Sequence, residues 1–245
     1  MAELISNSLR WFLNSDSDNC CVMEKTNSTF VYINEISLPI YGFKDLNDGE
    51  GHDLEDIRSP IANFAPAIRQ QNNEVMATGI PREYFDTHYY ADKQWYCFHG
   101  TKRPFYSDDD NDALDDRPYT DDDIAGVIYH GTDITTPAMI ELARYLASYS
   151  GTESGQVSYE IGTAPQALPL SETQQRLLFW QLRDTPKQQI AQHLGCSHYQ
   201  LEAQWQQLWE YLGVSNHHDC ISKAIALGYQ QMLPKSIFLA YCGAS

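Results

Sequence analysis

A group of polar side chains between residues 187 and 217 offers the positive charge, donors and acceptors that a polyanion requires. Lysine neutralises phosphate groups, and the amide of glutamine can pair with an adenine edge in the major groove of DNA. Glutamine is also simply a good helix former, and Glu202 would repel phosphate. The candidate DNA contacts are Lys187, Ser197, His198, Tyr199, Gln200, Gln204, Gln207 and His217.

Patterns that support catalysis or metal binding are missing from the sequence. There is no Ser/His/Asp arrangement, no H-E-x-x-H motif, no C-x-x-C pair and no phosphate-binding loop. The six cysteines form no His/Cys cluster at metal spacing, which is typical of reduced, buried thiols in a cytosolic protein. We therefore predict a protein that is not an enzyme, with no catalytic residues and no metal ligands.

An aspartate-rich segment, residues 108–123, is the one other place where cation binding deserves consideration. Hard cations take carboxylate oxygens, but a calcium loop needs fixed alternate spacing and a glycine turn, which this segment lacks. A solvated insertion between two strands is the preferred interpretation, and its role stays open.

Charge divides the chain into two unequal parts. Residues 1–164 hold 11 basic and 28 acidic residues, whereas residues 165–245 hold five of each, within a total net charge of −17. This difference suggests two units with different tasks and excludes an attraction of the whole chain to nucleic acid. The sequence has no apolar run long enough for a membrane span and no signal peptide, so we expect a cytoplasmic protein with no membrane partner.

Helix-start signals are concentrated near the C-terminus. Three segments fit the S/T-x-x-E/Q capping box, beginning at Ser171, Thr185 and Ser197, and each precedes a stripe of apolar residues. A tight turn at Gly195 separates the second helix from the third, which is the helix-turn-helix arrangement. A further helix is expected to end near Gly228.

The N-terminal half has the pattern of a mixed fold. A helix over Leu4–Leu13 and a helix over Pro60–Gln71 accompany runs of β-branched and aromatic residues. The expected strands are residues 20–23, 29–33, 82–87, 94–105 and 124–133. Strands that neighbour one another along the chain, rather than alternating with helices, favour an α+β domain.

These N-terminal residues resemble a PAS domain. A strand pair ends at Asn34 and leads through a short helix to Gly42-Phe43, and Lys102-Arg103-Pro104-Phe105 resembles the end of the penultimate PAS strand. The stretch from Gly126 through Gly131 to Asp133-Ile134-Thr135 resembles the last strand. The resemblance implies a five-stranded antiparallel sheet with flanking helices over residues 1–136, acting in sensing or dimerisation.

Cofactor chemistry can be compared with the same resemblance. Covalent flavin photochemistry needs an N-C-R-F motif, which is absent. Haem would need a neutral imidazole in the pocket, and the candidates His52, His88 and His99 are each explained as surface or packed histidines. We predict no cofactor. A small-molecule ligand in the PAS-like core and a fully packed core that serves dimerisation both remain open.

The segment 137–169 is expected to connect the two units. Residues 137–150 predict a helix that begins with Pro137, followed by a linker rich in glycine, serine and threonine up to Pro169. In PAS proteins such a helix carries dimer contacts. Folding back onto the sheet of its own domain is the other interpretation.

The segment from Leu170 to Leu227 resembles the helix-turn-helix of LuxR/GerE-type bacterial transcription regulators. The matching positions are Leu170-Ser171, Leu177-Leu178, Lys187, Ile190-Ala191, Leu194, Ser197, Leu212-Gly213-Val214-Ser215 and Ala224. Most of these are fold positions. Where the family usually has T-V-K-x-H in the third helix, this chain has Gln200-Leu201-Glu202-Ala203-Gln204, and Pro186 replaces an asparagine.

Together these features predict a PAS-like domain over 1–136, a connecting helix and linker over 137–169, and an all-α, four-helix helix-turn-helix domain over 170–235. The implied function is a cytoplasmic bacterial transcription regulator and sensor that forms a homodimer and binds promoter DNA. The alternative is a regulator with a degenerate helix-turn-helix that acts through a protein partner. Identity of the ligand, the promoter and the sign of regulation stay open.

Overall fold

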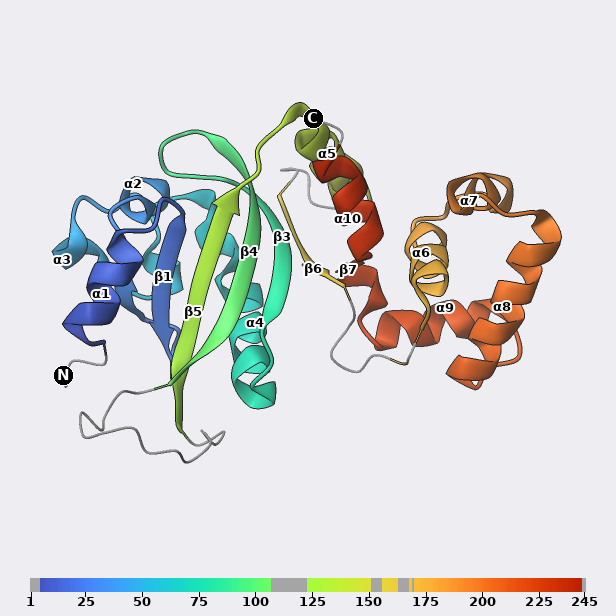
Figure 1. Ribbon diagram of the computed structural model, residues 1–245, viewed down its shortest axis with the longest axis horizontal. Coiled ribbons are helices and arrows are strands. Elements are labelled where there is room, and N and C mark those ends of the chain that lie inside the picture. Colours follow the sequence, from blue (N-terminus) through green and yellow to red (C-terminus); the bar gives the residue numbers. More distant parts are fainter. Residues whose placement is uncertain (1–4, 107–122, 151–155, 163–167, 169, 244–245) are drawn as a thin grey trace.

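A single twisted sheet forms the centre of the computed structural model, and a separate group of helices extends from one edge of it (Figure 1). The structure describes residues 5–106, 123–150, 156–162, 168 and 170–243. Nearly all of the aspartate-rich segment 108–123 lies outside these residues, so its predicted character is not tested. Within the described residues the sheet has seven strands in the order β2-β1-β5-β4-β3-β6-β7.

The five strands expected of a PAS-like sheet are all present, which confirms the predicted fold class. Their bounds are β1 (Asn19–Glu24), β2 (Phe30–Ile33), β3 (Arg82–Tyr89), β4 (Trp95–Tyr106) and β5 (Ile124–Asp133). Neighbouring strands among these five run antiparallel. Side chains alternate between the two faces of the sheet, and both faces are largely buried in β1 and β3.

One face of the sheet is covered by short helices and one longer helix. These are α2 (Ser37–Tyr41), α3 (Leu46–Gly49), η1 (Leu54–Asp56), η2 (Pro60–Phe64) and α4 (Ala65–Thr78). The predicted helix over residues 60–71 therefore begins as a 3-10 turn and continues further, to Thr78. Asn34 fixes the entry to α2, because its Oδ1 accepts from the backbone N–H groups of Cys20 and Ser37.

The opposite face is covered by α1 (Asn7–Asn14) beside β1 and by α5 (Pro137–Ser150) beside β3 and β4. Buried Met139, Leu142 and Leu146 of α5 pack with Phe85 and Tyr159 of the sheet. The connecting helix is thus folded back on the sheet of its own domain, which is the second of the two interpretations of the sequence.

The sheet does not end at the PAS-like strands. Strand β6 (Val157–Ile161) pairs antiparallel with β3, and β7 (Met232–Leu233) pairs parallel with β6. The prediction of a linker is therefore wrong for residues 157–161. Val157, Tyr159 and Ile161 are buried while the residues between them are less so, a two-residue period that the surrounding glycines, serines and threonines obscure.

The C-terminal helices form the predicted helix-turn-helix. Their bounds are α6 (Glu172–Gln181), α7 (Lys187–Leu194), α8 (His198–Leu212) and α9 (His217–Ala226). Gly195 has φ 63°, the left-handed conformation that glycine adopts without strain, and it turns the chain between α7 and α8. The core between the helices is built from Leu177, Ile190, Leu201, Trp205, Leu208 and Leu212.

Two of the three predicted capping boxes are present, at Ser171 with Gln174 and at Ser197 with Gln200. The third is wrong. Pro186, rather than Thr185, occupies the cap position of α7, and no side chain caps that helix. Thr185 is buried instead, with its backbone N–H donating to the carbonyl of Trp180.

The two parts of the molecule share a continuous apolar contact. After β7, helix α10 (Lys235–Cys242) packs against α5 and the sheet, where Phe238 lies 5.9 Å from Phe85 between ring centroids. Arg183, which follows α6, donates to the carbonyl of Phe179 and stacks its guanidinium over that ring. No helix among the described residues has both the length and the apolar character of a membrane span.

Candidate functional site

Helix α8 stands at the end of the molecule away from the sheet (Figure 1). One side of the helix is buried through Leu201, Trp205, Leu208 and Leu212, and the other side is polar. Tyr199 near its start is 85% exposed, so its ring and hydroxyl are available to a partner. The structure therefore presents the predicted recognition helix with its polar face outward.

Four charged or titratable side chains come together beside the start of α8. Lys187 Nζ lies 2.8 Å from Glu202 Oε1, and His198 Nε2 lies 3.9 Å from the same oxygen. His217, at the start of α9, packs edge-on against Trp205 with 4.6 Å between ring centroids. Burial, followed by the charge of Lys187, lowers the pKa of His217. The single lysine of this surface is therefore already paired with an acid.

The other predicted contacts occupy different positions. Ser197 and Gln200 are used by the cap of α8, where Gln200 Oε1 accepts from the backbone N–H of Ser197 at 2.8 Å. Gln207 faces α6, because its Oε1 accepts from Gln174 Nε2 at 3.5 Å. Gln204 is partly exposed and lies at the border of the buried stripe, three residues after Leu201 and four before Leu208. The structure thus groups Lys187, His198 and His217, and it separates Gln207 from them.

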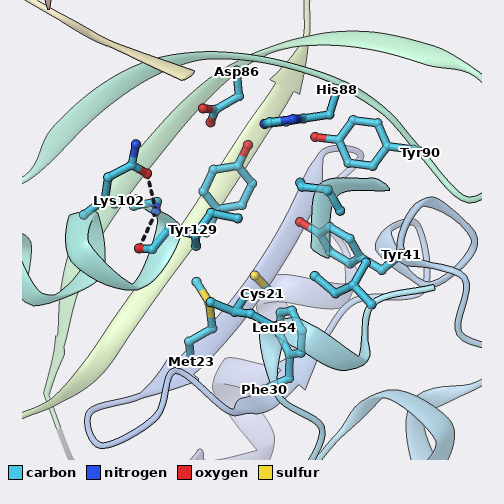
Figure 2. Close-up of a pocket in the computed structure, with 14 residues that line it drawn as sticks. Cys21, Met23, Phe30, Tyr41, Leu54, Asp86, His88, Tyr90, Lys102 and Tyr129 are labelled. Carbon is cyan, nitrogen blue, oxygen red and sulfur yellow. Dashed lines mark hydrogen bonds between the residues drawn. The ribbon is translucent and has the colours of Figure 1, made fainter. Parts of the chain in front are cut away.

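A second candidate site is a cavity between the sheet and its covering helices. The empty space between its lining atoms is about 450 Å³, a volume that includes open solvent at the mouth. The lining side chains include Cys21, Met23, Phe30, Tyr41, Leu54, Gln71, Asp86, His88, Tyr90, Lys102 and Tyr129. Figure 2 shows Asp86, His88 and the hydroxyl of Tyr129 at one end, and Met23, Phe30 and Leu54 at the other.

Lys102 is the cation of this cavity, and it is 2% exposed. Its Nζ donates to Gln71 Oε1 at 2.8 Å and to the carbonyl of Ile68 at 3.4 Å, both on α4. Burial lowers the pKa of Lys102 to about 8, while the charge of Asp86 acts in the opposite direction. A lysine held in this way can donate to a ligand or change its protonation state when one binds.

Asp86 and His88 point to the same face from β3, since residues two apart on a strand share a face. Burial lowers the pKa of His88, so its ring is neutral at pH 7 and offers one donor and one acceptor. Gly100 and Gly131 leave room for Tyr129, because a side-chain carbon at either glycine would lie within 3.0 Å of its ring or hydroxyl. This end of the cavity is therefore polar and enclosed.

Strand β6 contacts the polar end of the cavity directly. Asp86 Oδ1 accepts from Ser158 Oγ at 2.5 Å, and Gln71 Nε2 donates to Ser158 Oγ at 2.9 Å. His88 Nδ1 lies 3.3 Å from Gln156 Oε1. Because β6 also pairs with β7, the cavity and the helix-turn-helix are joined by one strand.

Of the three histidines considered for haem, only His88 lines this cavity. His52 lies beside Asp56 and stacks on Phe43, and His99 on β4 lies 3.0 Å from Glu83. His88 itself is packed edge-on against Phe64 with 4.7 Å between ring centroids. His88 is thus a packed histidine, whereas His52 and His99 are partly exposed and paired with acids.

Sequence reasoning missed the polar residues of the cavity. Asp86 and Lys102 lie inside strands that mix polar and apolar residues, so their residue types alone do not mark them as buried. Ser158 gives no signal either, because the composition of its segment predicts a linker. Their convergence depends on the register of β3 with β4 and β6, which no local pattern reports.

The fold and its two sites define a class: a PAS-like sheet domain with an internal cavity, joined through its edge strands to a helix-turn-helix. Solved structures with similar features cover both parts of this chain. The Vibrio cholerae VqmA dimer, described as a LuxR-type receptor in the absence of target DNA, is 23% identical and has a TM-score of 0.47. That similarity covers 95% of this chain and 93% of the other.

The phage VqmA–DPO complex is 25% identical, with 94% of this chain and 91% of the other covered and a TM-score of 0.45. The PAS domain of an HTR-like protein from Haloarcula marismortui covers 51% of this chain and 94% of its own, at 12% identity and a TM-score of 0.35. No family model matches the chain, and no curated protein matches it.

Proposed function

We propose that this chain is a transcription regulator that binds promoter DNA through α8 and responds to a small molecule held in the cavity of its sheet. The observation that carries the proposal is the placement of α8. The helix follows a glycine turn and lies at the end of the molecule away from the sheet (Figure 1). Its apolar side packs into the core of the helical region, so its polar side faces outward. A helix presented in this way fits the major groove.

The contacts with DNA divide into positioning and sequence recognition. Lys187 exchanges its exposed partner Glu202 for a DNA phosphate. His198 and Tyr199 are the first two residues of α8, and they contact the same DNA strand as Lys187. In this proposal Gln204, which is partly exposed, pairs with a base edge. Ser197 and Gln200 hold the start of the helix, whereas His217 supports Trp205 beneath it.

The proposal has to account for DNA affinity with few positive charges on the recognition surface. Lys187 is the single lysine or arginine of α7 and α8, and Glu202 neutralises it in the free protein. Two such helices in a homodimer double the number of phosphate contacts and read two half-sites together. We therefore include a homodimer in the proposal, and bacterial cytoplasm is the location that promoter binding requires.

A small, polar, partly flat molecule fits the chemistry of the cavity. Lys102 and Tyr129 offer donors, Asp86 offers an acceptor, and Phe30 and Tyr90 supply aromatic walls. A buried polar site of this kind discriminates strongly, because an unmatched donor or acceptor would be left unpaired. A ligand with both a donor and an acceptor on one edge satisfies it best.

The route from cavity to DNA runs through β6. A ligand that binds Asp86 competes with Ser158 for the same carboxylate, and Ser158 lies on the strand that pairs with β7. Release or strengthening of that hydrogen bond changes the position of β6 and therefore of the helix-turn-helix. The ligand thereby alters the spacing of the two recognition helices in a dimer.

A protein-interaction regulator is the second candidate function, and one observation favours it. The recognition surface is close to neutral because Glu202 pairs with Lys187 and approaches His198. Exposed Tyr199 and Tyr211 are residues that protein interfaces use often. A partner that binds the helix-turn-helix without DNA would confirm this second function.

Selection of genomic DNA fragments by the immobilised full-length protein at low salt tests the proposal. We expect a subset of fragments to be enriched by the wild type and lost with Lys187→Glu. Thermal shift with a panel of small polar molecules, together with DPO because it is named with a similar structure, tests the cavity.

Lys25→Glu, an equal charge change on the exposed β1–β2 turn, is the matched control and should leave the selected fragments unchanged. A ligand from the panel should raise the melting temperature of the wild type and have no effect on Lys102→Met. Enrichment of no fragment by the wild type, at the lowest salt in which it is monodisperse, would contradict DNA binding.

A further inference from the structure

A second cluster of chemistry-bearing side chains lies on the face of the sheet opposite the cavity. Cys20 on β1 and His130 on β5 are directly opposite each other in the antiparallel register, so both point to the face that α1 covers. The segment between α1 and β1 brings Asp16 and Asp18 to the same place. Among the described residues, Asp16, Cys20 and His130 form a group that could hold a metal ion.

The distances within this cluster fit the coordination shell of a small cation. His130 Nε2 lies 3.1 Å from Asp16 Oδ2 and 3.3 Å from Asp18 Oδ2. Ligands about 2.0–2.1 Å from a tetrahedral zinc ion lie roughly 3.3 Å from one another. The donor atoms of Asp16, Cys20 and His130 all lie within 4.8 Å of one another, and Asp18 joins this group through its contact with His130.

We propose that Asp16, Asp18, Cys20 and His130 bind a zinc ion. A thiolate, an imidazole nitrogen and carboxylate oxygens are the donors that zinc accepts, and a set with one sulfur and one nitrogen does not suit calcium or magnesium. The sequence could not reveal the site by spacing, because Asp16 and His130 are 114 residues apart. The site is independent of the cavity and of the proposed DNA contacts.

The surroundings of the cluster favour a cation. Cys20 is fully buried, and its sulfur lies within 4.8 Å of a carboxylate oxygen of Asp16. Zinc would bind the thiolate, and the displaced thiol proton would pass to solvent. Thr132 Oγ1 donates to Asp18 Oδ2 at 2.7 Å and so orients that carboxylate.

Zinc binding would link the segment after α1 to strand β5 at one end of the sheet. Asp16 and Asp18 follow α1, whereas His130 lies near the end of β5, three residues before the chain leaves the sheet towards α5. A metal ion at this point ties the N-terminal helix to the strand that leads into the connecting helix. Zinc should therefore stabilise the sheet domain against heat.

Cobalt provides the most direct test, because Co²⁺ replaces zinc and reports its ligands by absorption. We would strip the full-length protein with a chelator, add Co²⁺ at neutral pH under reducing conditions, and then displace it with Zn²⁺. The expected result is one equivalent of Co²⁺, tetrahedral d–d bands and a near-ultraviolet sulfur-to-cobalt charge-transfer band, all removed by zinc.

His130→Ala should abolish binding, and Cys20→Ser should remove the charge-transfer band. Cys196→Ser and His99→Ala are the matched controls, since these residues lie outside the cluster, and both should bind like the wild type. His130 is partly exposed, so its substitution keeps the test valid even if Cys20→Ser fails to fold.

Absence of a charge-transfer band in the wild type, or its persistence in His130→Ala, overturns the proposal.

Discussion

The helix-turn-helix and the sheet cavity differ in how their residues are brought together. The helix-turn-helix is built from neighbours in the chain, with a glycine turn at Gly195 and a cap at Ser197. The cavity is built from β3, β4 and β6, whose polar residues meet only through strand register. Local signals therefore place the first site and say little about the second.

The two sites also differ in their charges. Lys187 at the helix surface is exposed and paired with an exposed acid, an interaction that contributes little to stability. Lys102 in the cavity is buried, and removing its charge from water is costly. The exposed lysine is thus free to change partners, whereas the buried lysine is coupled to folding.

The largest expected effect is on thermal unfolding, from a substitution that weakens the packing between the sheet and the C-terminal helices. Phe238→Ala removes a ring that packs on Phe85, and a truncation of this kind costs about 3–5 kcal/mol in a well-packed core. We expect thermal unfolding, followed by calorimetry, to change from one transition into two. Leu239→Ala, at an exposed position of the same helix, should leave one transition at the wild-type temperature. Equal behaviour of the two variants would show that α10 does not couple the regions.

Replacement of the buried lysine should change the pH dependence of stability. The pKa of Lys102 falls from 10.5 to about 8 on folding, so between these values the unfolded chain binds more protons and the folded state gains stability as pH rises. Lys102→Met removes this penalty, and we expect stabilisation on the order of 1–3 kcal/mol at pH 7.

The free energy of unfolding of Lys102→Met, measured with urea, should exceed that of the wild type, and this difference should shrink between pH 8 and 10.5. Asp86, Cys21 and Glu74 also act on Lys102, so the informative quantity is the difference between variant and wild type. Lys44→Met, at an exposed site, is the control and should show no such difference. Parallel pH curves for Lys102→Met and the wild type would mean that the lysine is not buried as described.

Reversal of the exposed charge should act on binding and not on folding. Lys187→Glu places a second acid beside Glu202 and removes a phosphate contact, so we expect DNA affinity to fall about tenfold or more. The thermal melt should remain nearly unchanged, because the exposed pair that is lost stabilises the fold very little. A gel shift identical to that of the wild type would remove α7 from the DNA interface.

Neutralisation of Glu202 should have the smallest effect, and it should raise DNA affinity, whereas Lys187→Glu lowers it. Glu202→Gln frees Lys187 and reduces repulsion of phosphate, so affinity should rise by about twofold to tenfold. Fluorescence anisotropy with a selected fragment measures the change, and Glu210→Gln at the far end of α8 is the control. Weaker binding by Glu202→Gln would show that this carboxylate itself contacts the DNA bases.

Much of the fold could be predicted because its signals are local. The apolar stripe of α8 and the bounds of β5 follow from residue periodicity. Strand β6 escaped prediction because five alternating residues in a polar segment resemble a linker until β3 provides a partner. The cap of α7 was misplaced by one residue, since Pro186 takes the position that Thr185 occupies in the motif.

The site residues show the same division. Tyr199 lies away from the apolar stripe of α8 and is exposed, which local periodicity explains, but the pairing of Lys187 with Glu202 depends on how α7 crosses α8. The meeting of Asp86, Lys102 and Ser158 depends on three strands and one helix. Tertiary contacts of this kind have no counterpart in one-dimensional spacing.

The salt dependence of binding to a selected genomic fragment tests the central claim most directly. If α8 and Lys187 contact DNA phosphates, the logarithm of the association constant should fall linearly with the logarithm of salt concentration. Lys187→Glu should make that slope measurably shallower. Binding that is insensitive to salt, or absent at every salt concentration for both the wild type and Glu202→Gln, would contradict a DNA-binding function for this helix-turn-helix.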